Sequence, residues 1–568
     1  MAAQEALSRA HRMPFGAEVL AQGGVRFRLW APKARRVELC ISEKSFPMAR
    51  DGEWFERVHA DAAAGTLYQY RIDGGPLVPD PASRFQPQDV NGPSEVIDPE
   101  RFAWHDLGWR GRPWTEAVIC ELHVGTFTGE GTYAAVMQKL GHLRDVGITA
   151  LELMPLSDFA GRRNWGYDGV LHYAPDSAYG RPEDLKALVQ AAHNAGLMMF
   201  LDVVYNHFGP EGNYLGLYAP QFFTDKHQTP WGAAIDFSNE CVRSFFVHNA
   251  RYWIEEYGFD GLRFDAVHAI IDPSPRHILE EIRESIPARK HLVLENDANQ
   301  ARFVGPGKYD AQWNDDSHHA YHVLATGETD GYYVAYEKPG KHLARCLAEG
   351  FAYQGEVSPF TQAPRGEKSS QLPPSCFVDF LQNHDQIGNR ALGERLLSLA
   401  DERKLKALTA IHLLAPSPPL IFMGEEWGCR QPFLFFCDFK GELGQSVRKG
   451  RRAEFARFKG FTGEVPDPLS EKTFAASVLD WSKADQAWLA HYRQLLSLRQ
   501  REIVPLGCGP GRYRMLGERA FEVVWGKLVL IANCGDNEVQ VASAPESMPL
   551  WSNGAAGAPW SVNWWLLG

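Results

Sequence analysis

Hydrophobic and polar residues alternate with different periods along this chain, and the changes divide it into three regions. In residues 24–32 and 37–41 the apolar positions recur every second residue, and residues 66–71 form a further short run. That period is typical of strands with one buried face. Turn signals at Asp51-Gly52 and Asp73-Gly74 separate the runs. Residues 1–105 therefore predict an N-terminal β-sandwich domain.

Residues 106–500 repeat another unit, in which a short, almost wholly apolar run precedes an amphipathic stretch. The apolar runs predict strands at residues 117–122, 149–154, 198–204, 260–265, 291–295, 309–313, 376–381 and 419–423. The clearest predicted helices lie at residues 134–146, 182–195, 241–257, 277–286, 343–350, 403–414 and 486–500. Continuous apolar strands flanked by helices belong to parallel sheets covered on both faces, and eight such units close naturally into a barrel. A doubly wound sheet would need a Gly-rich loop after its first strand, which this chain lacks.

Two connections in the middle region are too long to be simple loops. They are residues 155–181 and 205–238, which follow the second and third predicted strands. Both lie at the carboxyl ends of strands, the face where barrel enzymes build their sites. Alternation returns in residues 521–525 and 527–532, so residues 501–568 predict a small C-terminal β domain. The predicted fold class is α/β, a (β/α)8 TIM barrel between an N-terminal β-sandwich and this C-terminal domain.

Composition narrows the function classes. The 568 residues carry a formal charge of −12 with no long run of either sign, which argues against nucleic acid or an anionic membrane as partner. The nine cysteines are scattered and form no C-x-x-C pair, and residues 1–16 lack an apolar leader. We therefore expect reduced thiols in a soluble, cytoplasmic protein. The 17 tryptophans fit sugar stacking or a large core; at Trp30 and Trp54 we favour packing.

Three carboxylates mark the candidate chemistry. Asp265, Glu295 and Asp385 follow the fourth, fifth and seventh predicted strands, so a barrel would bring them to one cavity. Arg263 lies two residues before Asp265, on the same face of its strand, and no cation adjoins Glu295 in sequence. A structural ion pair or a shared metal ion are alternatives. Acids with separate neighbours instead favour glycosidic cleavage by one charged and one protonated carboxyl group.

Four segments resemble the signature segments of the alpha-amylase superfamily, in the same order and at the same strands. They are Asp202-Val-Val-Tyr-Asn-His207, Gly261-Leu-Arg-Phe-Asp-Ala266, Leu294-Glu-Asn-Asp297 and Gln382-Asn-His-Asp385. Finer details resemble the maltooligosyltrehalose trehalohydrolases within it. They are Asp265-Ala-Val-His-Ala-Ile270, Glu295-Asn-Asp-Ala-Asn299, Leu372-Pro-Pro374, Phe380-Leu-Gln-Asn-His-Asp-Gln386 and Met423-Gly-Glu-Glu-Trp427. The N-terminal region is similar to a domain that branching and debranching enzymes share, and so it does not discriminate.

The resemblance implies a retaining hydrolase with three acidic residues in separate roles. Asp265 would be the nucleophile, Glu295 the general acid and base, and Asp385 the residue that stabilises the transition state. The implied substrate-binding residues are Tyr167, Asp202, His207, Arg263, His268, Asn383 and His384, joined by Glu426, Trp427 and Phe433 after the eighth strand. Among these, Arg263 would keep the nucleophile ionised and Tyr167 would stack on the sugar that is attacked. No cofactor and no metal ion is implied.

The implied substrate is a maltooligosyl trehalose, cut at the α-1,4 bond next to its terminal trehalose. The implied pathway partner is a maltooligosyl trehalose synthase. In this interpretation the residues after the eighth strand recognise trehalose, although the phenylalanines of residues 433–436 are equally compatible with core packing. A glucan branching enzyme and another amylase-type hydrolase remain alternatives, because they share the first chemical step. A catalytically inactive glucan-binding protein would have no need of three acids at strand ends.

Overall fold

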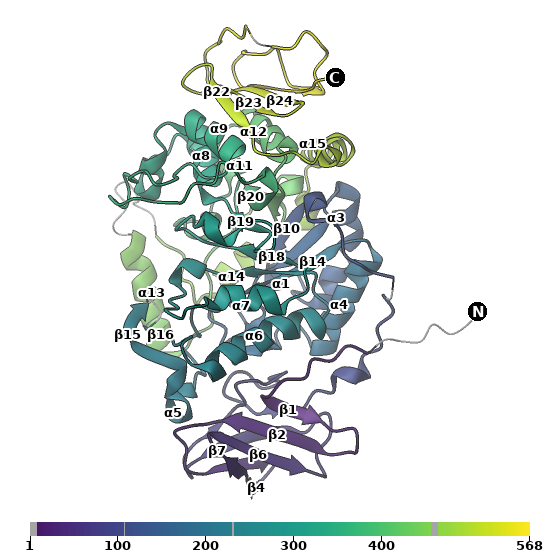
Figure 1. Cartoon of the computed structure of the whole chain (residues 1–568), viewed down its shortest axis with the longest axis vertical. Helices are drawn as coiled ribbons and strands as arrows, with labels where there is room; N and C mark the ends of the chain where they lie inside the picture. The colour runs from purple at the N-terminus through teal and green to yellow at the C-terminus, as the bar shows by residue number, and fades with distance from the viewer. Residues whose placement is uncertain (1–7, 107, 230–231, 456–463, 543) are drawn as a thin grey trace, which may run out of the picture.

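The structure, a computed structural model, describes residues 8–106, 108–229, 232–455, 464–542 and 544–568. Three parts follow one another along its longest axis (Figure 1). The N-terminal strands lie at one end, the helices and strands of the middle region form the body, and a C-terminal sheet covers the other end.

Eight parallel strands close into a barrel in the body of the molecule. They are β10 (Ile119–Leu122), β11 (Ala150–Leu153), β14 (Met198–Val203), β17 (Gly261–Phe264), β18 (His291–Leu294), β19 (Ala311–Trp313), β20 (Phe377–Phe380) and β21 (Pro419–Phe422). Each lies within a predicted strand, and the closure by pairing of β21 with β10 confirms the predicted fold class. Asp265 and Glu295 directly follow β17 and β18, whereas Asp385 lies in the first turn of a short helix, α10 (His384–Gly388).

Helices surround the barrel. Those at predicted positions are α2 (Tyr133–Met137), α3 (Leu140–Val146), α4 (Pro182–Asn194), α6 (Glu240–Glu255), α7 (Ile278–Ser285), α9 (Pro339–Glu349), α12 (Glu402–Leu414) and α15 (Gln486–Leu498). The sequence did not predict α8 (Asp315–Thr326) or α13 (Gly441–Phe455), nor the shorter α1 (Val124–Phe127), α5 (Leu215–Tyr218), α11 (Leu396–Leu399) and α14 (Glu471–Ser477). The predicted helix at residues 134–146 is interrupted between α2 and α3.

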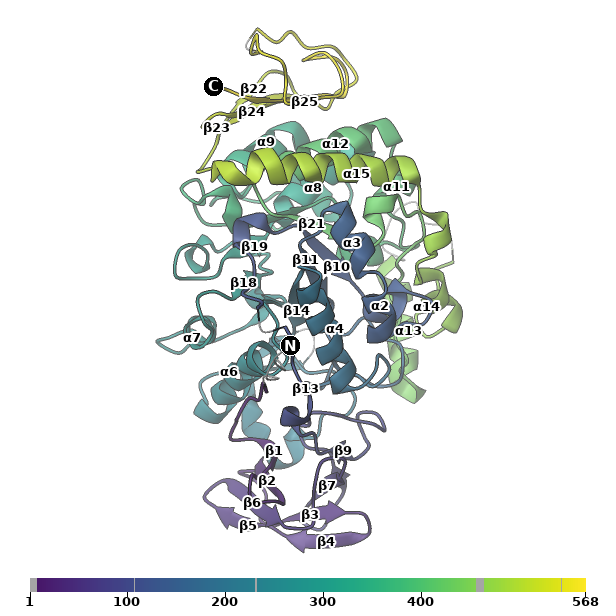
Figure 2. The same cartoon turned by 90° about the vertical axis from the view of Figure 1, so that its right-hand side faces the viewer.

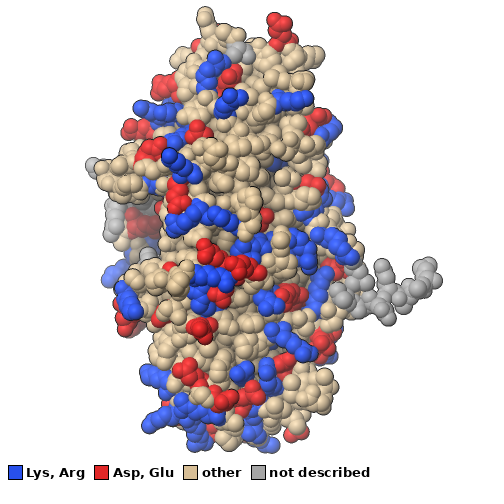
Figure 3. All heavy atoms as spheres, viewed as in Figure 1, with Lys and Arg blue, Asp and Glu red and all other residues tan. Residues whose placement is uncertain are grey.

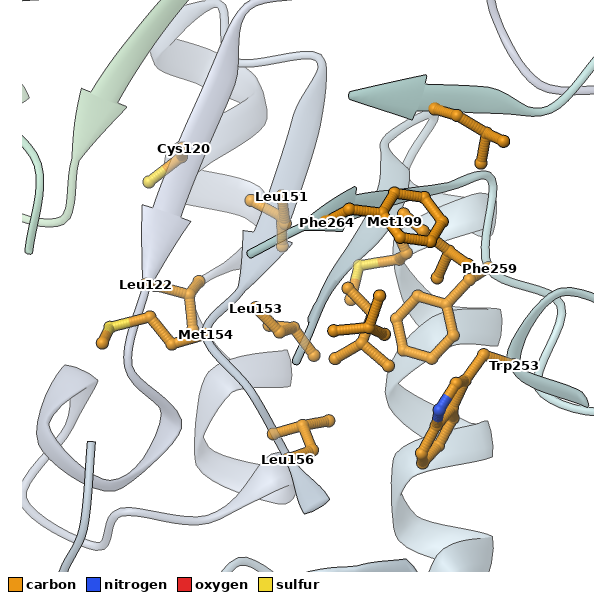
Figure 4. Close-up of a cluster of buried hydrophobic side chains, with 14 of the residues drawn as sticks. Cys120, Leu122, Leu151, Leu153, Met154, Leu156, Met199, Trp253, Phe259 and Phe264 are labelled. Atoms are coloured by element: carbon orange, nitrogen blue, oxygen red, sulfur yellow. The ribbon is translucent and has the colours of Figure 1, made fainter. Parts of the chain in front are cut away.

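The two faces of the barrel strands bury different residues. Outward side chains such as Leu151, Leu153 and Met199 pack with Phe259 and Trp253 in the large core between strands and helices (Figure 4). Inward side chains such as those of Ile119 and Ala150 form a second apolar cluster inside the barrel. Two residues further along β10 and β11 the same inward face carries Glu121 and Glu152, which are paired in register and buried. The barrel interior therefore changes from apolar to ionisable towards the carboxyl ends of the strands.

The N-terminal part consists of two antiparallel sheets. One has the order β1 (Gly16–Val19), β2 (Val25–Trp30), β6 (Trp54–His59) and β5 (Ala49–Asp51). The other has β4 (Lys44–Pro47), β3 (Val37–Ile41), β7 (Leu67–Ile72) and β8 (Leu77–Val78), with β9 (Ser94–Glu95) on β7. Trp30 is 3% exposed and packs against Phe222, and the guanidinium of Arg28 covers Trp54 at 4.3 Å. Both tryptophans therefore serve packing here.

The C-terminal sheet is antiparallel and lies over the barrel helices. Its strands are ordered β22 (Arg512–Met515), β23 (Ala520–Trp525), β24 (Leu528–Asn533), β26 (Ser561–Leu566) and β25 (Trp551–Ser552). Two buried indoles fix it, because Trp525 donates to Leu347 O of α9 and Trp564 to Ala410 O of α12. Helix α15 crosses the molecule beneath the sheet (Figure 2). Helical turns continue from α15 to Leu506, beyond the predicted boundary at residue 500. The domain boundaries at residues 105 and 500 stay a prediction.

The two long connections carry structure of their own. Strands β12 (Ser157–Asp158) and β13 (Leu171–Pro175) pair after β11, and β15 (Phe223–Thr229) pairs with β16 (Gly232–Ile235) after β14.

On the face of the molecule seen in Figure 3, basic and acidic side chains are interspersed. All nine cysteines are free thiols. Of the helices in the described ranges, none combines the length and apolarity that crossing a membrane requires.

Candidate active site

One buried guanidinium connects the carboxylates at the mouth of the barrel. Arg263 Nη1 lies 3.0 Å from Asp265 Oδ1 and 2.6 Å from Asp202 Oδ2, while Nη2 donates to Glu295 Oε2 at 2.7 Å. The side chain is 0% exposed and lies over the Trp313 ring at 4.0 Å. No cation adjoins Glu295 in sequence, but the fold brings one to it. The cation comes from the next strand, where Arg263 pairs in register with a residue two before Glu295.

Asp265 is held in place by a neighbouring strand as well. Asn206, which follows β14, donates from Nδ2 to Asp265 Oδ2 at 2.8 Å and to its backbone oxygen at 3.0 Å. Only 11% of the Asp265 side chain is exposed. The guanidinium of Arg263 on one carboxyl oxygen and the amide of Asn206 on the other hold the side chain in one orientation. It is therefore equipped as a nucleophile whose orientation is fixed.

Glu295 receives a backbone donor from an unusual turn. Ala266, next to Asp265, has φ +40° and ψ 49° in the left-handed region, a strained conformation for a residue with a Cβ. This turn directs Ala266 N to Glu295 Oε2 at 2.8 Å. Burial raises the pKa of Glu295 above its usual value, Arg263 opposes the rise, and Asp265 adds to it. A carboxyl group with a raised pKa keeps its proton to a higher pH than an ordinary glutamate does.

The third acid lies beside a charged histidine. Asp385 is the most exposed of the three acids, with 37% of its side chain accessible, and His384 Nε2 lies 3.5 Å from it. On its other side His384 is bound through Nδ1 to Glu121 Oε1, and its backbone N–H donates to Glu121 Oε2 at 3.0 Å. Burial by itself would lower the pKa of His384, but Glu121 and Asp385 raise it to about 9. His384 is therefore an imidazolium near neutral pH.

Tyr167 connects the histidines to the acids. Its ring stacks on His384 with centroids 4.9 Å apart, and its hydroxyl donates to Asp202 Oδ2 at 2.5 Å. His207 lies 2.8 Å from Tyr167 O through Nε2, and burial lowers the pKa of His207. The two histidines thus differ in charge, one neutral and one cationic. Asp202 is buried beneath this layer, where it supports Tyr167 and Arg263.

These groups line a single cavity of about 530 Å³ at the carboxyl ends of the strands. Of the predicted residues, it brings together Tyr167, His207, Asp265, His268, Glu295, His384 and Asp385. Arg263 and Asp202 lie buried behind this lining. A volume of this size suits an organic ligand rather than a lone ion. In the described part of the chain, no three His, Cys, Asp or Glu side chains are grouped to hold a metal ion.

Four further predicted substrate-binding residues do not line the cavity, and their direct contact with substrate stays a prediction. Asn383 is buried and caps α10, where its side chain accepts from Gln386 N. Glu426 is buried on His142 at 3.1 Å, and Trp427 is 1% exposed against Trp481. Phe433 is 0% exposed and stacks beneath Trp165, with ring centroids 5.2 Å apart. Large apolar side chains gain most by leaving water, which favours the core alternative.

The other residues of the lining are Trp165, Ala266, Asn389, Phe435, Val447, Arg451 and Glu454. Phe435 belongs to the phenylalanine run after the eighth strand that the sequence analysis weighed for trehalose recognition, and the rest were not predicted. Trp165 is two residues from Tyr167 in sequence, and this proximity to a predicted sugar-binding residue could have marked Trp165 as part of the site. Glu121, which supports the site from below, was also detectable, because it is a lone acid inside an otherwise apolar predicted strand.

The pair of Glu121 and His384 should make stability depend on pH. The folded pKa of about 9 exceeds the ordinary histidine value, so the pair stabilises fully below pH ~6.5 and loses this as pH rises through about 9. The shift corresponds to about 3 kcal/mol. Melting temperatures measured by differential scanning fluorimetry should place Glu121→Gln a few degrees below wild type at pH ~6.5 and close to it at pH ~9.5. A gap that does not change with pH would contradict the assignment.

Known proteins with similar sequences include glycosidases, in agreement with the arrangement of carboxylates in the cavity. Residues 97–218 match the alpha amylase catalytic domain family, and residues 14–83 match carbohydrate-binding module 48, the isoamylase N-terminal domain. A malto-oligosyltrehalose trehalohydrolase of Deinococcus radiodurans is 42% identical over 94% of this chain and 91% of its own length. One of Saccharolobus solfataricus is 43% identical over 86% and 87%.

A solved structure extends the likeness to the whole fold. A crystal structure of a Salmonella typhimurium protein described as a putative alpha amylase superposes with a TM-score of 0.94 and 46% sequence identity. The match covers 98% of this chain and 100% of that one. The barrel and both terminal β parts are therefore included in the similarity.

Proposed function

The chain belongs to the malto-oligosyltrehalose trehalohydrolase family, and we propose the chemistry by which its residues release trehalose from a maltooligosyl trehalose. It is a glycosidase of the alpha-amylase type that cuts the α-1,4-glucosidic bond next to the terminal trehalose. One observation supports the proposed mechanism above all. A single buried guanidinium lies between two carboxyl groups in different environments, at 3.0 Å from Asp265 and 2.7 Å from Glu295.

In the first step, Asp265 attacks the anomeric carbon of the glucose next to trehalose and forms a glycosyl ester. The bond to the trehalose oxygen breaks, and Glu295 gives that oxygen its proton. Positive charge develops on the sugar ring in the transition state, where the carboxylate of Asp385 stabilises it. The imidazolium of His384, the neutral imidazole of His207 and the ring of Tyr167 are available to bind this glucose.

In the second step, water attacks the glycosyl ester and releases the glycan. Asp265 carries no charge while it is esterified, and this neutrality changes the pKa of Glu295 in a useful direction. While Asp265 is charged it raises the pKa of Glu295, whereas a neutral ester no longer does so. Arg263 then lowers the pKa of Glu295 with less competition. Glu295 becomes a better base for the attacking water, and the α configuration is retained. Hydrolysis regenerates Asp265 as a carboxylate and Glu295 as an acid.

The proposed roles extend to the surroundings of the site. His268, exposed at the cavity beside Glu295, would contact the leaving trehalose, and Arg263 and Asp202 would position the acids without touching substrate. We place the enzyme in the cytoplasm, which its nine free thiols support. The terminal trehalosyl group requires an enzyme that makes it, so a maltooligosyl trehalose synthase would precede this reaction. Domain boundaries at residues 105 and 500 are part of the proposal.

Substrate preference tests this function directly. Maltotriosyl trehalose and maltopentaose contain the same number of glucose units and differ in the last linkage. We expect kcat/KM for maltotriosyl trehalose to exceed that for maltopentaose by about tenfold or more, because trehalose bends where maltose does not. Free trehalose should be the main product, measured by ion chromatography.

Two results would replace this function by an alternative. Equal cleavage of the two substrates would indicate a general amylase. New α-1,6 branch points on amylose, detected by proton NMR, would indicate a branching enzyme, because the glycosyl ester would then pass to a sugar hydroxyl instead of water.

A further inference from the structure

One helix supplies a wall of the cavity that the chemistry does not use. Val447, Arg451 and Glu454 on α13 all line the cavity. They are four and three residues apart, a spacing that places side chains on one face of an α-helix. An aliphatic group, a guanidinium and a carboxylate thus form a continuous strip towards the ligand space.

The strip is anchored next to the catalytic residues. Arg451 Nη2 donates to the backbone oxygens of Gly388 and Arg390, just beyond Asp385, and Nη1 lies 3.1 Å from Glu454 Oε2. The Arg451 guanidinium also covers the Phe435 ring at 5.4 Å. Phe435 continues the wall to the buried ring of Trp165, with centroids 5.3 Å apart. The arrangement fixes a charged pair beside aromatic surface, a combination that suits sugar hydroxyls and sugar C–H faces.

Barrel topology determines which part of the substrate this wall meets. The strand order is β10, β11, β14, β17, β18, β19, β20 and β21, so β21 lies four positions from β17, across the barrel. Helix α13 follows β21, whereas Asp265 and Glu295 follow β17 and β18. The leaving group must lie on the side of Glu295, because Glu295 protonates its oxygen. The part of the substrate that stays on Asp265 therefore extends away from Glu295, towards α13.

We propose that Val447, Arg451 and Glu454 bind the α-1,4-linked glucose chain on the glycone side of the scissile bond. This inference rests on the proposed function and adds a division of labour to it. The α13 strip senses the length of the maltooligosyl chain, and trehalose is selected at the opposite side, near His268 and Glu295. The region after β21 then has a role in substrate recognition other than the trehalose contact that the sequence predicted.

Glycone length tests the proposal. Maltosyl trehalose and maltotetraosyl trehalose carry two and four glucose units on the glycone side. In Glu454→Ala the ratio of kcat/KM for the long substrate to that for the short one should fall about three- to tenfold, as expected for lost polar contacts. Val447→Trp, which fills the wall, should lower the same ratio independently. Arg452→Ala is the matched control, since Arg452 is an exposed neighbour on α13 that does not line the cavity.

The outcomes separate this proposal from the function on which it rests. An unchanged length ratio in both variants would overturn it. A loss of preference for trehalosyl substrates over maltooligosaccharides, with the length ratio intact, would also overturn it, since the wall would then face the leaving group. If wild type rejects every trehalosyl substrate, the proposed function fails. The length ratio is then measured with 4-nitrophenyl α-maltoside and α-maltotetraoside, where the same fall supports the glycone wall.

Discussion

The Asp265→Asn variant should lose about 10⁴-fold or more in kcat on every substrate, natural or activated. An asparagine amide is too weak a nucleophile to form the glycosyl ester, so the two-step pathway is closed at its first step. The substitution keeps the shape of the side chain, and Arg263 retains Asp202 and Glu295 as partners. Initial rates with maltotriosyl trehalose and with an aryl α-maltoside measure the effect.

A folded protein is the necessary control for this loss. Melting temperature and circular dichroism of Asp265→Asn should stay near wild type. Two findings would refute the nucleophile assignment. One is activity of Asp265→Asn within about tenfold of wild type. The other is an initial wild-type product with the β configuration by NMR, because one displacement inverts the anomeric carbon and two retain it.

Much of the fold follows from periodicity alone. Short, mostly apolar runs such as residues 291–295 are typical of a parallel strand with both faces covered, and all eight predicted runs contain barrel strands. Helix α13 was not predictable in this way. Its sequence, GELGQSVRKGRRAEF, is polar on most sides and includes three glycines, so neither propensity nor an apolar stripe marks it. It matters for the cavity rather than for the core.

The catalytic acids of the candidate site were predictable from sequence, because the carboxyl ends of barrel strands converge on one cavity. Three carboxylates after apolar strands were sufficient to place Asp265 and Glu295 in one cavity. The hydrogen-bond partners were less accessible, because sequence spacing reveals neighbours on one strand and not across strands. Arg263 was paired with Asp265 for that reason, and its contact with Glu295 came from the register of β17 and β18.

Burial separates the aromatic residues after β21 into those that line the cavity and those that lie behind it. Trp427 and Phe433 are aromatic and follow a barrel strand, which suits a sugar site and a core equally well in sequence. In the structure both are at most 1% exposed, and only the next layer, with Trp165 and Phe435, reaches the cavity. A sequence pattern fixes that a side chain is apolar, but the folded packing decides which layer it occupies.

Glu295 offers the sharpest distinction between the acids, because its proton matters only when the leaving group is poor. Its raised pKa keeps that proton present up to a higher pH than for an ordinary glutamate, and activity should decline as pH rises through this pKa. Glutamine at this position can keep the hydrogen bond from Arg263 to its carbonyl oxygen, so the geometry around Asp265 survives. It cannot donate an acidic proton at any pH.

In Glu295→Gln, kcat/KM for maltotriosyl trehalose should therefore fall by about 10² to 10⁴, whereas cleavage of a 2,4-dinitrophenyl α-maltoside should fall less than about tenfold in its first step. The dinitrophenolate leaves without a proton, so a burst of it should appear before slow hydrolysis of the ester, which lacks its base. The basic limb of the pH profile should also vanish for the activated substrate. Stopped-flow absorbance measures the burst, and the matched variant Asp265→Asn should show none. Equal losses on both substrates would mean that Glu295 is not the acid, and that its position beside Arg263 serves structure alone.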